Sequence, residues 1–338
     1  MSNKKDLYID NSLILNTTGD NLFDDIYIEY NSLPEINFDD IDTSVEFLGK
    51  KISFPLIINS MTGGTEKGLE INEILFTLAH ELDIVLGVGS QEEEIDDEEL
   101  SLFFLGDMND DINENTIILS NLSARAKKED VKKAMDKIHS KGICLYLNPA
   151  QEAVSYDGNK DFTGVLENIE EIVKEYGDKV IVKEKGMGMN KATIKKLVNA
   201  GVKNIDVSGY GGTNFIEMEN LRNYRNDFSE LYNWGIPTAK SILDAREVSK
   251  DIKIISSGGI KTGLEVAKSI IIGADYVGVS GELLRYLLHG GYEQAKKYIE
   301  DLMYKTKIVM FLLGVKNIEE LKKVDYKIIG KLKELMEK

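Results

Sequence analysis

Two glycine turns within residues 252–281 have the spacing of a phosphate-binding site. The stretch IKIISSGGIKTGLEVAKSIIIGADYVGVSG reads as a strand, Gly258-Gly259, a helix, a second strand and Gly281. Each turn leads into a helix, so backbone N–H groups and helix dipoles can converge on one anion. In a (β/α)8 barrel, the loops after the seventh and eighth strands commonly bind phosphate. We therefore predict phosphate binding here, and the alternative, that these glycines only form tight turns, stays open.

Further candidate side chains follow six earlier apolar runs. Most carry amides or hydroxyls, and Lys183 is the one cation that we expect within a strand. An ion pair between Lys183 and Glu184 is the alternative reading, but adjacent strand residues point to opposite faces. Such a site suits a cofactor that performs the reaction itself, and FMN fits with one phosphate, a flat ring and a lysine near its N1. The candidates are residues 60–64 and 89–91, Asn121, Asn148, Gln151, Glu152, Lys183, Glu184, Ser208 and residues 211–213.

The chain offers few residues suited to a protein metal site or to a catalytic cysteine. His80, His139 and His289 all fall in helical patterns and lack metal-ligand spacing, so we expect them on the surface or in packing contacts. Cys144 lies in the apolar run GICLYL and is predicted to be a core residue. The acidic residues within 92–99 are predicted to be solvated surface rather than a metal site.

Eight apolar runs alternate with helical patterns, which predicts parallel strands joined by right-handed crossovers. The chain is therefore predicted to be an α/β protein, a (β/α)8 TIM barrel in one domain, with an open doubly wound sheet as the alternative. Residues 1–50 are predicted as an N-terminal extension that caps the barrel, 51–290 as the barrel and 291–338 as amphipathic helices. The predicted strands are 55–64, 84–90, 116–121, 142–148, 179–186, 202–212, 252–259 and 275–281.

Composition narrows the class of partner. The formal net charge of the 338 residues is −17, which argues against nucleic acid and requires local features to hold an anionic ligand. One cysteine excludes intrachain disulfides and fits a reducing compartment. No apolar run approaches the roughly 20 residues of a membrane helix, and the N-terminus lacks a signal-peptide core. We therefore expect a cytoplasmic protein with no membrane partner.

The order of several short motifs adds a family resemblance. The motifs MTGGT, GVGSQ, LNPAQE, VKE-G-GM, DVSG-GGTNF, WG-PTA and SGGI together resemble the type II isopentenyl-diphosphate isomerases, from about residue 22 to the C-terminus. The resemblance implies an FMN-dependent barrel that interconverts isopentenyl and dimethylallyl diphosphate. Reduced FMN would act as acid and base, NAD(P)H would reduce it, and the assembly would be a homotetramer. FMN would contact Met61, Thr62, Gly63, Ser90, Asn121, Lys183, Ser208, Thr213, Gly259, Ile260, Lys261, Ser280 and Gly281.

The same resemblance implies roles on the substrate side of the site. Gln151 and Lys183 would be the catalytic residues, and Glu152 would hold Mg2+ on the diphosphate, as a hard cation with phosphate oxygens requires. The implied substrate contacts are Lys4, Lys5, Ser90, Gln91 and Gln151.

Three departures from the family pattern touch the substrate side. The family opens with Arg-Lys and then His, where this chain has Lys4-Lys5 and Tyr8. Glu92 stands where many members have arginine, and Tyr146 stands where the family has histidine. Two alternatives therefore remain beside the isomerase: an FMN-dependent oxidoreductase on the same barrel, and a flavin-binding member that has lost the isomerase activity.

Overall fold

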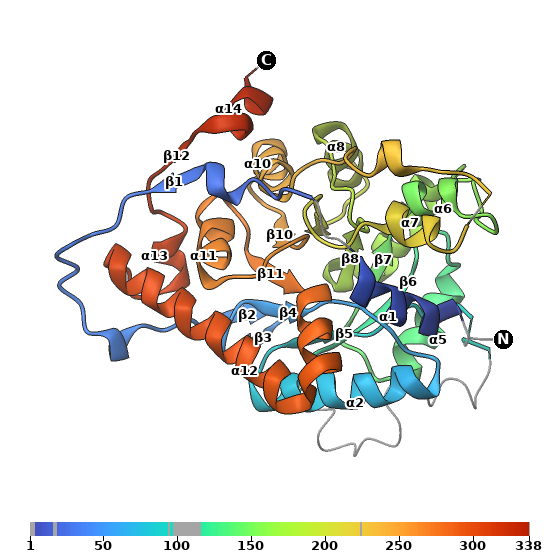
Figure 1. The fold of residues 1–338 in the computed structure, drawn as a ribbon, viewed down its shortest axis with the longest axis horizontal. Helices are drawn as coiled ribbons and strands as arrows, with labels where there is room; N and C mark the ends of the chain where they lie inside the picture. Colours follow the sequence, from blue (N-terminus) through green and yellow to red (C-terminus); the bar gives the residue numbers. More distant parts are fainter. Residues whose placement is uncertain (1–3, 16–18, 94, 97–115, 224, 338) are drawn as a thin grey trace.

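The computed structural model describes residues 4–15, 19–93, 95–96, 116–223 and 225–337, and its centre is a closed barrel of eight parallel strands (Figure 1). Neighbours in the chain are neighbours in the barrel, and the last strand pairs with the first. This closure confirms the eight predicted strands and excludes the open sheet. The strands are β4 Leu56–Ile58, β5 Val85–Gly87, β6 Ile118–Ser123, β7 Gly142–Tyr146, β8 Val180–Lys183, β9 Asn204–Asp206, β10 Lys253–Ser256 and β11 Tyr276–Val279.

Helices follow the strands and surround the barrel (Figure 1). Thr262 caps the start of one of them: its side chain accepts from the backbone N–H of Glu265, and the Glu265 carboxylate accepts from the backbone N–H of Thr262. The helices after β4 are α2 Glu66–Glu81, α5 Lys128–Lys137, α6 Pro149–Val154, α7 Val165–Tyr176, α8 Lys191–Asn199, α9 Phe215–Asn220, α10 Thr238–Val248, α11 Gly263–Ile271 and α12 Gly281–Leu313. Short 3-10 turns are η1 Phe23–Asp25, η2 Phe38–Asp40, η4 Gly177–Lys179 and η5 Ser229–Leu231.

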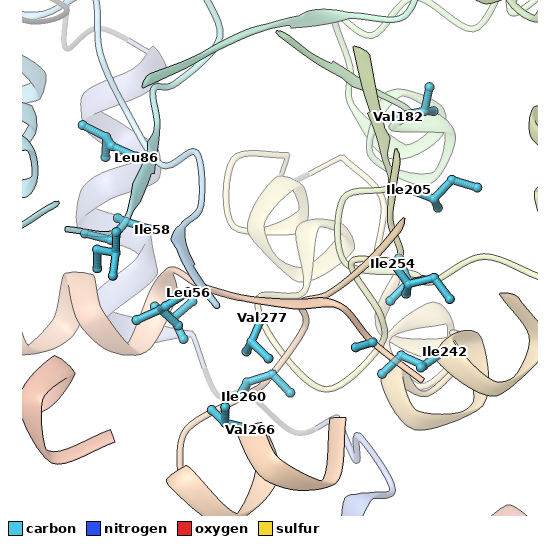
Figure 2. Close-up of a cluster of buried hydrophobic side chains, with 14 of the residues drawn as sticks. Leu56, Ile58, Leu86, Val182, Ile205, Ile242, Ile254, Ile260, Val266 and Val277 are labelled. Carbon is cyan, nitrogen blue, oxygen red and sulfur yellow. The ribbon is translucent and has the colours of Figure 1, made fainter. Parts of the chain in front are cut away.

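Alternation along each strand divides the apolar residues into two clusters. Val182, Ile205 and Val277 point outward and belong to the same large cluster as the helix residues Ile242 and Val266 (Figure 2). Ile181 and Tyr276, the chain neighbours of Val182 and Val277, belong to a separate cluster inside the barrel. Because side chains alternate with a period of two, Lys183 and Asp206 share the inward face. The inner cluster consists of Ile57, Val85, Ile117, Leu119, Cys144, Ile181, Ile255 and Tyr276, with Phe47 and Ile52.

The N-terminal extension closes one end of the barrel. β2 Val45–Phe47 and β3 Lys50–Ile52 form an antiparallel hairpin. The Phe47 ring meets the Tyr276 ring edge-on at 4.8 Å, and Tyr276, the first residue of β11, donates to the Glu46 carbonyl. The hairpin therefore plugs the end at which the strands begin.

Helix α1 Lys4–Ile14 lies at the opposite end. Lys5 donates to the Ser90 carbonyl beyond β5 at 2.9 Å, and Tyr8 donates to Glu219 on α9. The extension therefore contributes to both ends of the barrel, and α1 covers the end where the strands finish.

The C-terminal part differs from the prediction in two places. The boundary drawn at 290/291 falls inside α12, at a kink where Gly291 has φ 67. Ile328 was predicted to be helical, but it lies in β12 Tyr326–Ile328, which pairs antiparallel with β1 Ile26–Ile28 (Figure 1). The remaining helices are α13 Ile318–Leu321 and α14 Gly330–Met336. Among the described residues, no helix is both long and apolar enough to cross a membrane.

Candidate active site at the mouth of the barrel

A cavity opens where the barrel strands end. Residues of β6, β7, β8 and β11, and residues directly after β4 and β10, line it together with Tyr8 and Ser12 of α1. The structure thus brings together side chains that are far apart in the sequence. The predicted cofactor residues that line the cavity are Met61, Asn121, Lys183, Ser208, Thr213, Gly259, Ile260, Lys261, Ser280 and Gly281.

The predicted glycine turns lie side by side in this cavity. Gly258 and Gly259 have φ of 109 and 81, a left-handed backbone that favours glycine. A Cβ on Gly259 would lie 2.1 Å from the carbonyl oxygen of Gly211, so the turns after β9 and β10 approach too closely for any side chain. Gly281 opens α12 beside them, and a Cβ there would meet only Thr213 Oγ1, at 3.1 Å. The result is a backbone-lined recess next to a helix N-terminus, which suits a phosphate group.

Lys183 has a partner that the sequence did not suggest. Its ammonium lies 3.9 Å from Oδ2 of Asp206, with the lysine and aspartate side chains 8% and 2% exposed. Asp206 also accepts from Asn59 Nδ2 at 2.9 Å and from Ser257 Oγ at 2.6 Å. The rejected pair with Glu184 is absent: Glu184 instead accepts from the backbone N–H of Met187. The cavity therefore contains one buried cation fixed at the end of β8.

Several buried polar atoms near β4 and β6 lack a protein partner. They are Ser60 Oγ, Thr62 Oγ1 and Asn121 Oδ1, and Ser60 and Asn121 line the cavity. Buried polar groups are normally satisfied, so these atoms are suited to a ligand with polar edges. An FMN ring carries carbonyl and N–H groups at one edge, and the glycine recess suits its phosphate. The residues present therefore fit FMN.

Three predicted cofactor residues are not part of the cavity lining. Thr62 and Gly63 are buried beside it, and the Thr62 carbonyl accepts from Gly89 N–H at 2.8 Å. Ser90 lies at the rim, where its hydroxyl is 3.2 Å from Tyr146 Oη. These residues shape the wall around the cavity.

Gln151 belongs to a buried network over the mouth. It lies on the short helix α6. Its amide donates to Glu219 Oε1 at 2.7 Å and to Tyr8 Oη at 3.1 Å, while its own Oε1 is buried without a partner. Arg222 pairs with Glu219 at 2.6 Å. Burial and the Glu219 carboxylate keep the pKa of Tyr8 well above its ordinary value, so Tyr8 stays a neutral donor.

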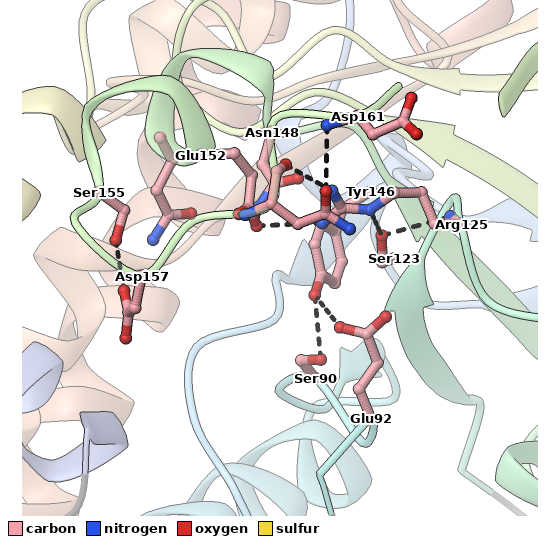
Figure 3. A network of polar contacts seen from close by, with 12 residues as sticks. Ser90, Glu92, Ser123, Arg125, Tyr146, Asn148, Glu152, Ser155, Asp157 and Asp161 are labelled. Carbon is pink, nitrogen blue, oxygen red and sulfur yellow. Dashed lines mark hydrogen bonds and ion pairs between the residues drawn. The ribbon is translucent and has the colours of Figure 1, made fainter. Parts of the chain in front are cut away.

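Glu152, the predicted magnesium ligand, is fully engaged in the structure (Figure 3). Its Oε1 accepts from Arg125 at 3.1 Å and from Asn148 at 2.9 Å, and its Oε2 accepts from the backbone of Asn159 at 2.6 Å. No group of three or more His, Cys, Asp or Glu side chains within the described ranges could hold a metal. In this structure Glu152 forms an ion pair with Arg125, and a metal bound here would need ligands besides Glu152.

The two departures at positions 92 and 146 contact each other (Figure 3). Tyr146 Oη donates to Glu92 Oε2 at 2.7 Å. Burial raises the pKa of Tyr146, so the phenol keeps its proton. Glu92 is exposed at the rim, and its carboxylate accepts this hydrogen bond from the tyrosine. Of the predicted acidic surface cluster, Glu94 and residues 97–99 lie outside the described residues.

The other predicted substrate residues divide into rim and interior. Lys4 pairs with Asp157 at 3.3 Å, and Lys5 binds the Ser90 carbonyl, so both stand at the edge of the mouth. Gln91 is placed differently from the prediction. Its amide donates to the Ala134 carbonyl at 3.1 Å and accepts from Asn121 N–H at 3.2 Å. Gln91 therefore supports the backbone of β6 and does not reach the cavity.

The sequence analysis missed one lysine of the cavity, Lys185. Lys185 lines the mouth two residues beyond Lys183. Its ammonium lies 5.2 Å from the centre of the Tyr146 ring and 4.5 Å from that of Phe215. Burial, followed by the charge of Lys183, lowers the pKa of Lys185 to about 8. The spacing of two residues from Lys183 was the signal in the sequence.

The residues predicted to lie outside the site do so. Cys144 is buried inside the barrel, and burial raises its pKa to about 12. His80 Nδ1 lies 3.0 Å from Thr116 Oγ1, while His139 and His289 are exposed. None of the three histidines lines the cavity.

Comparisons with known proteins agree with this geometry. Residues 103–327 match the family model of FMN-dependent dehydrogenases. The isopentenyl-diphosphate delta-isomerase of Geobacillus sp. (strain WCH70) is 40% identical, over 96% of this chain and 92% of that protein. The isopentenyl-diphosphate delta-isomerase of Pyrococcus abyssi is 38% identical, over 93% of this chain and 88% of that protein.

Solved structures support the fold alone. A lactate oxidase of Pediococcus acidilactici superposes with a TM-score of 0.66 at 15% identity, over 96% of this chain and 87% of that one. A flavocytochrome b2 variant with pyruvate bound superposes with a TM-score of 0.65 at 19% identity, over 100% of this chain and 82% of that one. The sequence matches place the chain in the family of isopentenyl-diphosphate delta-isomerases, in its FMN-dependent, type II branch.

Proposed function

We propose that this protein is an FMN-dependent isomerase that interconverts isopentenyl diphosphate and dimethylallyl diphosphate. The observation that carries the proposal is the content of the cavity, where glycine turns, amides and hydroxyls surround the buried Lys183. Histidine and cysteine, the common protein acids and nucleophiles, are absent among its described lining residues. A reaction in this cavity therefore depends on a bound cofactor.

The chain's own residues would hold and tune that cofactor. The recess at Gly259 and Gly281 would bind the FMN phosphate, and Ser60 and Asn121 would meet the polar edge of the ring. Reduced FMN, with NAD(P)H as its proposed reductant, supplies the acid and base for moving the double bond. Lys183, held by Asp206, would place a positive charge where it stabilises the anionic reduced ring.

Gln151 would position the substrate above that ring. Tyr8 and Glu219 fix its amide nitrogen and leave its buried carbonyl oxygen without a partner. Apolar lining from Met61, Phe215 and Met218 suits a five-carbon chain. Lys4 and Lys5 at the rim add positive charge near the entrance.

We propose that Glu152 binds Mg2+ together with the substrate diphosphate. Mg2+ typically takes one or two carboxylates, with phosphate oxygens and waters completing its shell. Glu152 would have to release Arg125 to accept the metal, because both of its oxygens are engaged in the described state. Glu152→Gln should keep the flavin spectrum and lose most turnover and its Mg2+ dependence. An unchanged turnover across a Mg2+ titration would contradict this role.

The activity itself is tested by product analysis. Purified protein is loaded with FMN, photoreduced and incubated with isopentenyl diphosphate and Mg2+. Dimethylallyl diphosphate as the product supports the isomerase. Substrate reduction coupled to flavin reoxidation would indicate an oxidoreductase, and the absence of both would indicate a flavin-binding protein without this activity.

We also propose a homotetramer in the cytoplasm. Helix α12 exposes Tyr304 and Leu312, which are 57% and 40% exposed and suit a partner surface. The free, buried thiol of Cys144 suits a reducing compartment. Light scattering at micromolar protein should report a mass above that of the monomer, and a monomer mass would contradict the assembly.

A further inference from the structure

Lys185 stands on the side of the mouth where the substrate residues gather. β8, which it follows, pairs with β7, whose last residue is Tyr146. The glycine turns follow β10 and β11, farther round the barrel. Glu219, Glu152 and Lys4 are among the charges that act on Lys185, and they belong to the Gln151 network and the rim. Lys185 is therefore close to the proposed substrate groups.

The ammonium of Lys185 has aromatic neighbours but no anionic partner. It lies over the rings of Tyr146 and Phe215, at 5.2 and 4.5 Å. Within the part of the chain that the structure describes, it forms no ion pair and no hydrogen bond. Two other cavity cations have such partners: Lys183 pairs with Asp206, and Arg285 lies 3.7 Å from Glu282.

A cation held between two aromatic faces keeps its ammonium donors free for an incoming anion. Cation–π contact contributes modestly, roughly 0.5–2 kcal/mol, and does not satisfy the N–H groups. Lys185 is half-buried, and partial removal of a charge from water without an ionic partner costs free energy, so a bound anion would stabilise the site. The protein's strongly negative net charge makes a local cation more important for an anionic substrate.

We propose that Lys185 binds the diphosphate of the substrate and acts as a specificity-determining residue of the mouth. This inference rests on the proposed function, since it assigns the substrate's anionic end. At positions 92 and 146 the chain presents a carboxylate and a neutral phenol, bound to each other. Lys185, packed on that same phenol, supplies the positive charge at this side of the cavity.

The test uses Lys185→Met, which keeps the length of the side chain and removes its charge, and Lys185→Arg, which keeps the charge. In FMN-loaded protein the flavin phosphate occupies the glycine recess, so added inorganic pyrophosphate reports on the substrate side. A lost charge-assisted contact corresponds to a change of about 10- to 100-fold. We expect Lys185→Met to raise KM and the Kd of pyrophosphate by that factor, with FMN content retained. Lys185→Arg should stay within a few-fold of wild type.

Lys250→Met is the matched control, because Lys250 is exposed and precedes β10 at the closed end of the barrel. It removes the same charge and should leave both constants unchanged. An unchanged KM and pyrophosphate affinity in Lys185→Met would overturn the inference. So would a loss of FMN affinity without a change in pyrophosphate binding, since it would assign Lys185 to the flavin.

The pyrophosphate measurement separates this inference from the proposed function. If the wild type lacks isomerase activity, the function fails, yet weaker pyrophosphate binding by Lys185→Met still supports the anion site. Between pH 7 and 9 the wild type should lose affinity relative to Lys185→Arg, because the pKa of Lys185 is about 8. The charged and titratable groups facing it are Lys183, Glu219, Glu152, Lys4 and Tyr146. The same pH dependence in both proteins would contradict a role for the Lys185 ammonium.

Discussion

The Lys183–Asp206 pair makes a sharp stability prediction for Asp206→Asn. The substitution keeps the shape of the side chain and removes its charge. Lys183 would then remain as a buried cation, 8% exposed, with no other ion-pair partner in the described part of the chain. Removing one member of a buried pair typically costs about 3–5 kcal/mol, because the other charge is left uncompensated.

This cost converts to a measurable melting shift. For 338 residues, an unfolding entropy of about 2.1 cal/mol/K per residue gives roughly 0.7 kcal/mol/K. A loss of about 4 kcal/mol therefore lowers Tm by about 6 °C. The assay is calorimetry of the FMN-free protein at fixed concentration, so that ligand binding does not contribute.

Asp244→Asn is the control, because this carboxylate is equally buried, at 2% exposed, but its partners Lys240 and Lys191 are 22% and 31% exposed. Those lysines stay in contact with water, so we expect a shift of less than about 2 °C. The double variant Asp206→Asn/Lys183→Met should recover much of the loss, since no charge is left buried. Equal shifts for both aspartates, or additive losses in the double variant, would refute the reasoning.

Three further predictions follow from single residues. Lys183→Ala should weaken the binding of reduced FMN more than that of oxidised FMN, which would lower the midpoint potential of the flavin. Equal losses of affinity for the two forms would contradict the position of Lys183 beside the ring. Gly259→Ala should abolish FMN binding, since its Cβ would lie 2.1 Å from the Gly211 carbonyl oxygen, while circular dichroism should show an intact barrel. The control Gly201→Ala also has a positive φ, 88, but the nearest atom to its Cβ is 3.4 Å away, so it should retain FMN. Burial raises the pKa of Glu184 from 4.5 to about 8, so the folded state binds a proton that the unfolded state has released, and stability falls as pH rises through this window. Glu184→Gln should flatten that slope in denaturant titrations, and an unchanged slope would exclude Glu184 as its source.

The barrel was predictable because its strands repeat one simple pattern. Short β-branched runs such as residues 252–255 end at glycine or small polar residues, and each is followed by helical spacing. The glycine recess was predictable for the same reason, since Gly258 and Gly259 follow a strand directly. These features depend on local sequence, which fixes both the strand and its turn.

The missed features depend on contacts between distant segments. Asp206 is held by Asn59, 147 positions away, so its role appears only when the barrel closes. Glu219 reaches Tyr8 over 211 positions through the placement of α1. β12 is three residues long, and Ile328 is a strand residue only because Ile26 pairs with it. Lys185 was within reach of sequence reasoning, because a residue two positions beyond an inward-facing lysine shares its direction.

The measurement that most directly tests the central claim follows flavin and product together. FMN-loaded protein is photoreduced without oxygen in D2O and given isopentenyl diphosphate and Mg2+, while absorbance and NMR spectra are recorded. Isomerisation by proton transfer predicts many turnovers of deuterium-labelled dimethylallyl diphosphate with the flavin reduced throughout. Flavin reoxidation in step with substrate loss, or a reduced substrate as the product, would contradict it.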